Sequence, residues 1–268
     1  MAIVSPALRL TARVLRRLAQ KIDAINSDVL PAVDQWHNCG FGELDIDAVA
    51  LAHVAAGGEA SFVQIGAHDG VSDGVMRACV DVGGMRGLFV EPQPGPFATL
   101  AQAYANNPLI SCEKTVVGSA DGTARLYSVE PQFWARHRLP AGVASQISSL
   151  FRDHIRAHVA RFGGEALAQR EADYLRWEDV PSCTLPTLLA RHNLHAPGLM
   201  VIDTEGFDFE IIKMINWTRP PAILCYESIH LSADDRQASW DLLRAQGYSL
   251  HTVGDINTLA VRIPDKRG

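Results

Sequence analysis

Apolar residues recur along this chain with two different periods, and their order predicts an α/β fold. From residue 61 onward, short continuous apolar runs that are typical of buried strands alternate with stretches that have helical spacing. Continuous apolar strands that alternate with helices indicate a mostly parallel, doubly wound sheet with both faces covered. The predicted strands are residues 61–65, 87–91, 111–117, 123–129, 199–203 and 222–227, and the predicted helices are 71–82, 96–105, 186–192, 207–215 and 235–246.

The two ends of the chain depart from this alternation. Residues 248–253 and 258–263 flank a glycine-aspartate turn, which predicts an antiparallel C-terminal hairpin. Near the N-terminus, apolar residues between Leu8 and Val29 follow helical spacing close to a heptad. We therefore expect an N-terminal helical extension over residues 1–58 and an α/β domain over residues 59–268.

The N-terminal helix has several candidate partners. Its first 22 residues carry four arginines, one lysine and no acid, and the arginines interrupt the apolar core that a secretory signal needs. We expect the apolar stripe to pack on its own domain or across a homodimer. Weak contact with an anionic membrane surface and a transit peptide are the alternatives.

Amino-acid composition limits which binding partners and which cellular compartment can be expected for this protein. The chain has 268 residues and a formal net charge of −6, so it lacks the overall positive charge typical of nucleic-acid binding. Its five cysteines are widely spaced and form no C-x-x-C pair, which argues against a disulfide framework or a structural zinc site and predicts a cytoplasmic location. The sequence contains no apolar run that is long enough to span a bilayer.

Polar groups recur directly after the predicted strands, where ligands bind in open α/β sheets. Gly66 and Gly70 follow the first strand and allow a tight turn with close approach of the backbone to a ligand. Glu91 ends the second strand, where a carboxylate can accept both hydroxyls of a ribose. The G-x-G-x-x-G and P-loop fingerprints are absent, so the pattern favours S-adenosylmethionine over a nicotinamide dinucleotide and weakens an oxidoreductase assignment.

Four segments resemble the FkbM family of S-adenosylmethionine-dependent methyltransferases, and the resemblance extends over roughly residues 60–262. They are Phe62–Gly70, Leu88–Pro94, Val201–Asp208 and Tyr226–Leu231. The resemblance implies a class I methyltransferase fold, which is Rossmann-like, and methylation of a hydroxyl on a sugar or natural product. The sequence departs from the family at Gln64, where many relatives carry an acid, and at Pro186, where relatives often have aspartate and where proline suits a first helical turn.

These patterns together predict the cofactor site and the catalytic site. Transfer to a hydroxyl needs a base or a metal, and we expect a base without a metal; a divalent metal on Asp203, Glu227 and His230 is the alternative. We expect Asp203 and Glu205 to contact the cofactor or the acceptor, although either could instead cap the next helix. The cofactor set is Gln64, Gly66, Ala67, Asp69, Gly70, Glu91, Ser119 and Asp203, and the catalytic set is Asp203, Glu205, Glu227 and His230.

Residues 131–181 interrupt the α/β rhythm, and we predict that they form an inserted lid over the acceptor. The segment combines Trp134 and Trp177 with a run of arginines, which suits a sugar, a phosphate or a nucleotide-sugar. A solvated helical face with alternating charge is the alternative. Histidines other than His230 are assigned structural roles.

We therefore expect O-methylation of a sugar hydroxyl on a glycan, glycolipid or natural product. The alternative is a methyltransferase-like nucleoside-binding scaffold without turnover.

Overall fold

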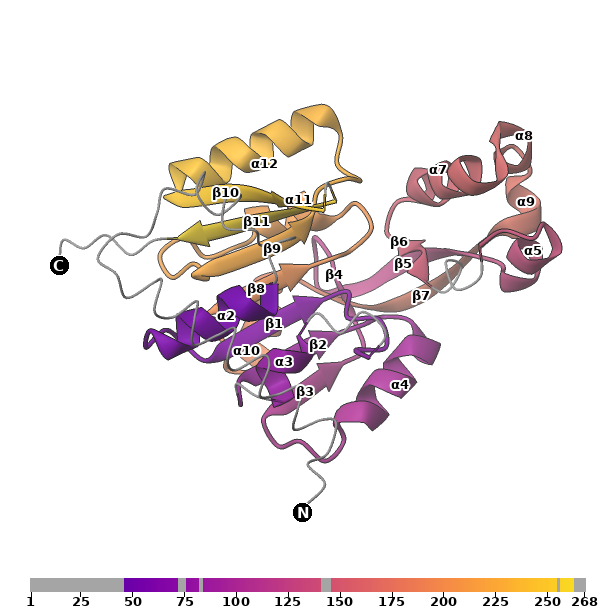
Figure 1. Cartoon of the computed structure of the whole chain (residues 1–268). Helices are drawn as coiled ribbons and strands as arrows, with labels where there is room; N and C mark the ends of the chain where they lie inside the picture. The colour runs from indigo at the N-terminus through magenta and orange to yellow at the C-terminus, as the bar shows by residue number, and fades with distance from the viewer. Residues whose placement is uncertain (1–45, 72–75, 82–83, 141–145, 255, 263–268) are drawn as a thin grey trace, which may run out of the picture.

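A computed structural model describes residues 46–71, 76–81, 84–140, 146–254 and 256–262 of the chain. The apolar stripe predicted between Leu8 and Val29 lies outside these residues. Within them, a seven-stranded sheet has the order β10-β11-β9-β8-β1-β2-β3 (Figure 1). Its strands are β1 (Ser61–Ile65), β2 (Arg86–Val90), β3 (Ile110–Glu113), β8 (Leu199–Ile202), β9 (Ile223–Glu227), β10 (Tyr248–Val253) and β11 (Asn257–Arg262).

The pairing directions confirm the predicted α/β fold of the class I methyltransferase type. Strand β1 pairs in parallel with both β2 and β8, and β3 and β9 extend the parallel sheet on either side. Strand β11 runs antiparallel to β9 and to β10, so the predicted C-terminal hairpin is present. The strand order reverses between β1 and β8, and ligands of such sheets bind in the crevice beyond the carboxyl ends at that point.

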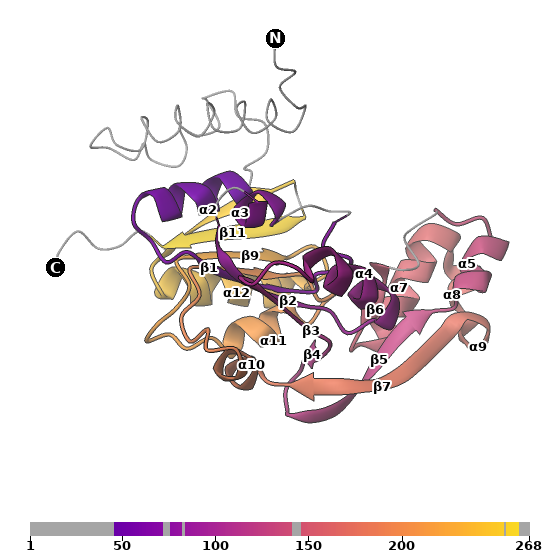
Figure 2. The same cartoon turned by 90° about the horizontal axis from the view of Figure 1, so that it is seen from below.

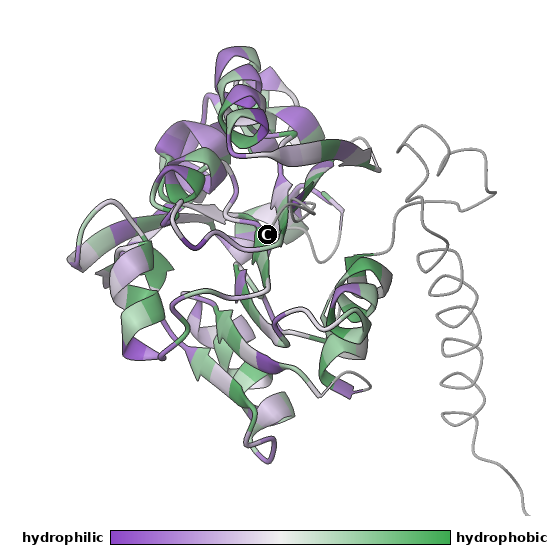
Figure 3. Ribbon diagram, turned by 90° about the vertical axis from the view of Figure 1, so that its left-hand side faces the viewer, coloured by the Kyte–Doolittle hydropathy of each residue, from purple (hydrophilic) through white to green (hydrophobic). Residues whose placement is uncertain are grey.

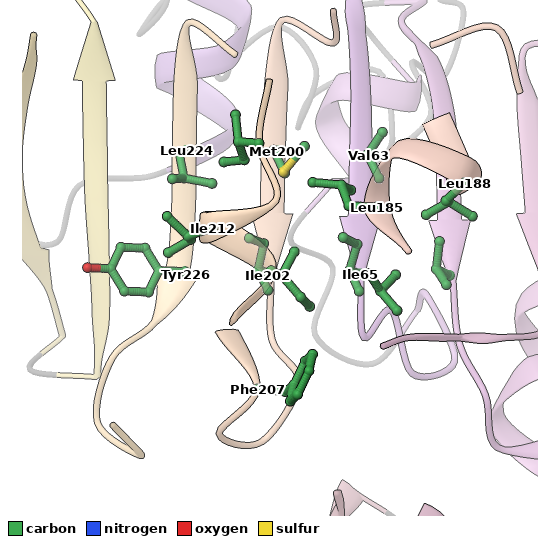
Figure 4. Close-up of a cluster of buried hydrophobic side chains, with 14 of the residues drawn as sticks. Val63, Ile65, Leu185, Leu188, Met200, Ile202, Phe207, Ile212, Leu224 and Tyr226 are labelled. Carbon is green, nitrogen blue, oxygen red and sulfur yellow. The ribbon is translucent and has the colours of Figure 1, made fainter. Parts of the chain in front are cut away.

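Helices cover both faces of the sheet because successive strand residues point to opposite sides. Val63 and Ile65 of β1 pack with α10 (Leu185–Arg191), α11 (Asp208–Lys213) and α12 (Ala233–Ala245), as Figure 4 shows for part of this cluster. Phe62 of β1 instead packs with α2 (Ile46–Ala55), α3 (Arg77–Asp81) and α4 (Pro94–Tyr104) on the other face (Figure 2).

Helix α12 combines polar residues with an apolar side that includes the buried Leu243, as a helix between a sheet and solvent should, whereas the sequence of α2 is almost wholly apolar. In Figure 3 most of the helices carry both apolar and polar residues. Among the described residues, every helix is too short or too polar to span a bilayer.

A second, four-stranded sheet with the order β4-β7-β5-β6 carries the segment predicted as a lid. Its helices have a separate small core that includes Phe133, Ile155 and Tyr174, and Figure 1 shows them beyond the end of the main sheet. The elements of this insert are β4 (Val116–Val117), β5 (Gly122–Val129), α5 (Pro131–Arg136), β6 (Ser148–Ser149), α7 (Arg152–Gly163), α8 (Glu165–Ala168), α9 (Glu171–Tyr174) and β7 (Leu175–Cys183).

Two element predictions need correction. The single strand predicted over 111–117 is two strands, because β3 stays in the main sheet while Val116 and Val117 pair with β7 in the insert. The helix predicted over 71–82 spans only Arg77–Asp81 among the described residues.

Candidate active site

A cavity of about 420 Å³ lies beyond the carboxyl ends of β1, β2, β8 and β9. The insert closes another side of it with Leu126, Gln146, Ser148, Ser149 and Leu150. Three predicted site acids other than Glu91 line this cavity, namely Asp203, Glu205 and Glu227. Ligands of doubly wound sheets bind where this cavity lies, so it is the candidate active site.

Glu91 is a buried carboxylate that holds the loop after β1 in place. Its Oε2 accepts the backbone N–H of His68 at 2.9 Å, and its Oε1 accepts the backbone N–H of Gln93 at 2.9 Å. Only 3% of Glu91 is exposed, and this burial raises the pKa of its carboxyl, although the two backbone hydrogen bonds act in the opposite direction. Each oxygen keeps lone-pair capacity for one further donor from a ligand.

The glycine turn after β1 has a structural reason besides the ligand. Gly66 has φ +80°, and a Cβ there would lie 1.6 Å from the carbonyl oxygen of Asp203. The backbone directly after β8 therefore excludes any side chain at this position. His68, in the same loop, also has a positive φ, of 48°, and lines the cavity. Strained non-glycine residues of this kind cluster at functional sites.

The other predicted cofactor residues do not line the cavity directly. Gln64 and Ala67 are buried in and after β1, Asp69 accepts the backbone N–H of Val71, and the carbonyl of Gly70 accepts the hydroxyl of Tyr104. Ser119 is exposed and does not line the cavity, because the chain leaves the main sheet after β3 and enters the insert.

Three acids meet at the carboxyl ends of β8 and β9. Asp203, Glu205 and Glu227 each place a carboxylate oxygen within 4.8 Å of the others. Asp203 keeps surface toward the cavity while protein encloses it, and this enclosure, together with the charges of Glu227 and Asp208, raises its pKa well above the ordinary value. Three negative charges this close together repel one another, so the three carboxyl groups do not all ionise readily. The group is therefore suited to holding and releasing a proton.

A fourth acid, Asp208, stabilises the loop between β8 and α11 through hydrogen bonds within that loop. Its Oδ2 accepts the hydroxyl of Thr204 at 3.0 Å and the backbone N–H of Gly206 at 3.2 Å. The side chain is fully buried, and this burial, reinforced by the charge of Glu227, raises its pKa to about 7. The sequence analysis did not single out Asp208 as a site residue.

The insert brings two histidines to Glu205, and the sequence analysis missed both. Nε2 of His154 lies 2.7 Å and Nε2 of His158 lies 3.3 Å from Oε2 of Glu205. Burial alone would raise the pKa of Glu205, but the hydrogen bonds and charge of these histidines outweigh it and lower the pKa to about 2. The H-x-x-x-H spacing in α7, which puts both rings on one helix face, is the signal that could have identified them.

The predicted His230 belongs to the same cluster. Its Nε2 lies 3.4 Å from Glu205 and 3.4 Å from Glu227, so the predicted pairing with Glu227 is present. Burial lowers the pKa of His230, but its contacts with Glu227 and Glu205 raise it by more.

The arginines of the insert lie elsewhere. Arg152 pairs with Glu171 and Arg156 pairs with Glu165 on the surface, and Trp134 is buried in the core of the insert. Trp177 is exposed, with Arg125 stacked on its ring at 4.0 Å. No arginine or lysine of the described residues lines the cavity. For Arg152 and Arg156 the structure therefore favours the charged solvated face over a direct ligand contact.

Comparison with known proteins places the sequence in one family. The profile described as the methyltransferase FkbM domain matches residues 64–250. No curated protein matches the sequence significantly.

Two solved structures to which the chain is similar are named as methyltransferases. Methyltransferase FkbM from Methylobacillus flagellatus KT is 14% identical with a TM-score of 0.42, and the match covers 75% of this chain and 43% of that one. Precorrin-6y C5,15-methyltransferase from Geobacter metallireducens GS-15 is 10% identical with a TM-score of 0.39, and the match covers 81% of this chain and 87% of that one.

Proposed function

The chain belongs to the FkbM methyltransferase family, and from this premise we propose that it transfers the methyl group of S-adenosylmethionine to a sugar hydroxyl on a glycan, glycolipid or natural product. One observation carries the proposal. A single cavity has Glu91, a carboxylate suited to a ribose, in one wall and the carboxylates of Asp203 and Glu227 in another. The cofactor and an acceptor hydroxyl can therefore meet in one cavity.

The residues that are present fit the cofactor. A volume of about 420 Å³ lies within the range of roughly 300–1,000 Å³ that is common for small-molecule sites. Glu91 would accept the two ribose hydroxyls, and Val90, Val116 and Val117 would form apolar walls for the adenine. The lining carries four acids and no lysine or arginine among the described residues, which suits the positive charge of a sulfonium.

The cofactor, when bound, supplies an activated methyl group, so the protein needs to hold the acceptor in line and remove one proton. Asp203 and Glu227 line the cavity, and they are our candidates for accepting the hydroxyl proton. Burial and the neighbouring carboxylates raise the pKa of Asp203, which makes its ionised carboxylate a stronger proton acceptor than an ordinary aspartate. Glu205 and His230 would position this pair, because Nε2 of His230 lies 3.4 Å from both Glu205 and Glu227.

The charge of the cavity also bears on the acceptor. An anionic lining without lysine or arginine among the described residues disfavours a phosphate at the reacting end and favours a neutral hydroxyl. A phosphate or diphosphate carried by a nucleotide-sugar would then lie outside the cavity.

Incubation with labelled S-adenosylmethionine and fractionated neutral glycans and glycolipids tests this proposal. We expect label in a hydroxyl-bearing acceptor, a large loss of transfer in Asp203→Asn, and unchanged cofactor affinity in Ser119→Ala, which lies off the cavity. Cofactor binding without transfer to any fraction would favour the scaffold alternative. Label only in amines would refute O-methylation.

A further inference from the structure

Three histidines from two distant parts of the chain converge on one carboxylate oxygen. His154 and His158 stand four residues apart on α7 of the insert, and His230 follows β9 of the main sheet. Glu205 follows β8 and has φ +55°, a conformation that is uncommon for a residue with a side chain. The hydroxyl of Ser149 donates to the backbone carbonyl of Glu205 at 2.8 Å and helps to hold this conformation.

The distances are those of a ligand shell. Nε2 of His158 and Nε2 of His230 lie 3.3 and 3.4 Å from Oε2 of Glu205, while Nε2 of His154 lies at 2.7 Å. One ligand atom from each of the four residues lies within 4.8 Å of all the others. Ligands about 2.0–2.1 Å from a tetrahedral zinc ion are separated by roughly 3.3 Å. A small shift of His154 would bring all three histidine nitrogens to this spacing from Oε2 of Glu205.

Hydrogen bonds within the cluster do not account for the burial of one of these side chains, His158. His158 has only 9% of its side chain exposed, its Nδ1 has no hydrogen-bond partner among the described residues, and its Nε2 contacts Glu205 at the longer distance of 3.3 Å. The ring belongs to a cluster where the ring centroids lie 4.5 to 4.9 Å apart. Buried polar groups are rarely left unpaired, and coordination to a cation would satisfy Nε2 of His158.

We propose that His154, His158, Glu205 and His230 bind one divalent transition-metal ion of the zinc type. Three imidazoles with one carboxylate suit zinc, cobalt or nickel, whereas magnesium and calcium prefer sites built wholly from oxygen. Four protein ligands complete a tetrahedral shell, which is the pattern of a structural site. The ion fastens α7 of the insert to the edge of the main sheet, beside the cavity that Glu205 lines.

This site differs from the metal alternative considered for Asp203, Glu227 and His230. That alternative uses Asp203 and Glu227, the two candidates for the catalytic base. The histidine site shares only His230 with it and takes His154 and His158 from the insert. Binding of metal is measured without any methyl transfer, so the proposal stands or falls independently of the proposed function.

The test uses the full chain, stripped with chelator and titrated with Zn²⁺ or Co²⁺. We expect one equivalent to bind, Co²⁺ to show the visible absorption of tetrahedral nitrogen and oxygen coordination, and Zn²⁺ to raise the melting temperature. His158→Ala should weaken binding at least tenfold and remove the Co²⁺ spectrum. His195→Ala, at an exposed histidine away from the cluster, is the matched control and should bind like the wild type.

Three results would overturn the proposal. They are no binding of Zn²⁺ or Co²⁺ by the wild type, binding that persists unchanged in His158→Ala, and a thiolate charge-transfer band that assigns the ion to cysteines. Circular dichroism of the metal-free proteins checks folding. If His158→Ala does not fold, Glu205→Gln, which keeps the size of the side chain, is judged by the same criteria.

Discussion

Replacing Asp208 with asparagine should change how the stability of this protein depends on pH. The aspartate is fully buried, its Oδ2 accepts two hydrogen bonds, and its Oδ1 has no partner among the described residues. Burial first, and the charge of Glu227 second, raise its pKa from 3.8 to about 7. Asparagine has nearly the same shape but cannot ionise, so Asp208→Asn removes this titration from the folded state.

The sign and size of the effect follow from proton linkage. Between pH 4 and 7 the folded protein holds a proton on Asp208 that the unfolded chain has released, so the stability that this group contributes is lost as pH rises through that window. A shift from 3.8 to about 7 corresponds to roughly 4 kcal/mol in full. Between pH 5 and pH 8, the range accessible to most assays, the expected change is about 2–3 kcal/mol.

Urea unfolding at pH 5, 6, 7 and 8 measures this effect. The difference in unfolding free energy between Asp208→Asn and the wild type should move by about 2–3 kcal/mol in favour of the variant as pH rises from 5 to 8. Any constant penalty from the new amide cancels in that comparison. Asp241→Asn removes the same charge from an exposed side chain and controls for net charge. A difference that is flat with pH would refute the reasoning.

Three further changes test the site. Glu91→Ala leaves the backbone N–H of His68 unpaired and removes the proposed ribose acceptor, so calorimetry should show S-adenosylhomocysteine affinity weaker by about 1–3 kcal/mol, and wild-type affinity would exclude Glu91 from the site. Glu227→Gln should lower turnover about a hundredfold or more with cofactor affinity near normal, which single-turnover rates on an identified acceptor can check. Gly66→Ala puts a Cβ against the Asp203 carbonyl and should lower the stability of the folded protein by at least about 1–3 kcal/mol, which thermal melts can measure. Gly95→Ala, whose Cβ would meet open space, is the control and should melt like the wild type. Equal melting temperatures for the two variants would show that the backbone after β8 shifts at little cost.

The order and kind of most elements could be predicted from the sequence. Apart from β3, whose predicted run extended to residue 117, the main strands lie within about two residues of their predicted positions, because a strand buried on both faces needs a continuous apolar run wherever it lies. The edge that carries Glu91, Asp203 and Glu227 was predictable for the same reason, since parallel strands place their carboxyl ends together. Their placement in one cavity agrees with this expectation.

The boundaries of the insert and the surroundings of its side chains could not be predicted in this way. Ser119 follows an apolar pair, Val116 and Val117, that resembles the end of a main-sheet strand but pairs with β7. The arginines of α7 suggested a site for an anionic ligand. In the structure Arg152 and Arg156 pair instead with Glu171 and Glu165, which lie in helices whose position depends on how the insert folds back.

Local periodicity determined which elements form and which way they face in this protein, because it depends only on neighbours a few residues away. Which distant side chains meet was decided by the tertiary structure alone. Glu205 lies 51 residues from His154 along the chain, and their contact at 2.7 Å exists because the insert returns α7 to the carboxyl edge of the main sheet. Burial at that meeting point shifts the pKa values of the site acids, and the fold gathers three imidazoles around one carboxylate; no pattern within one element contains that information.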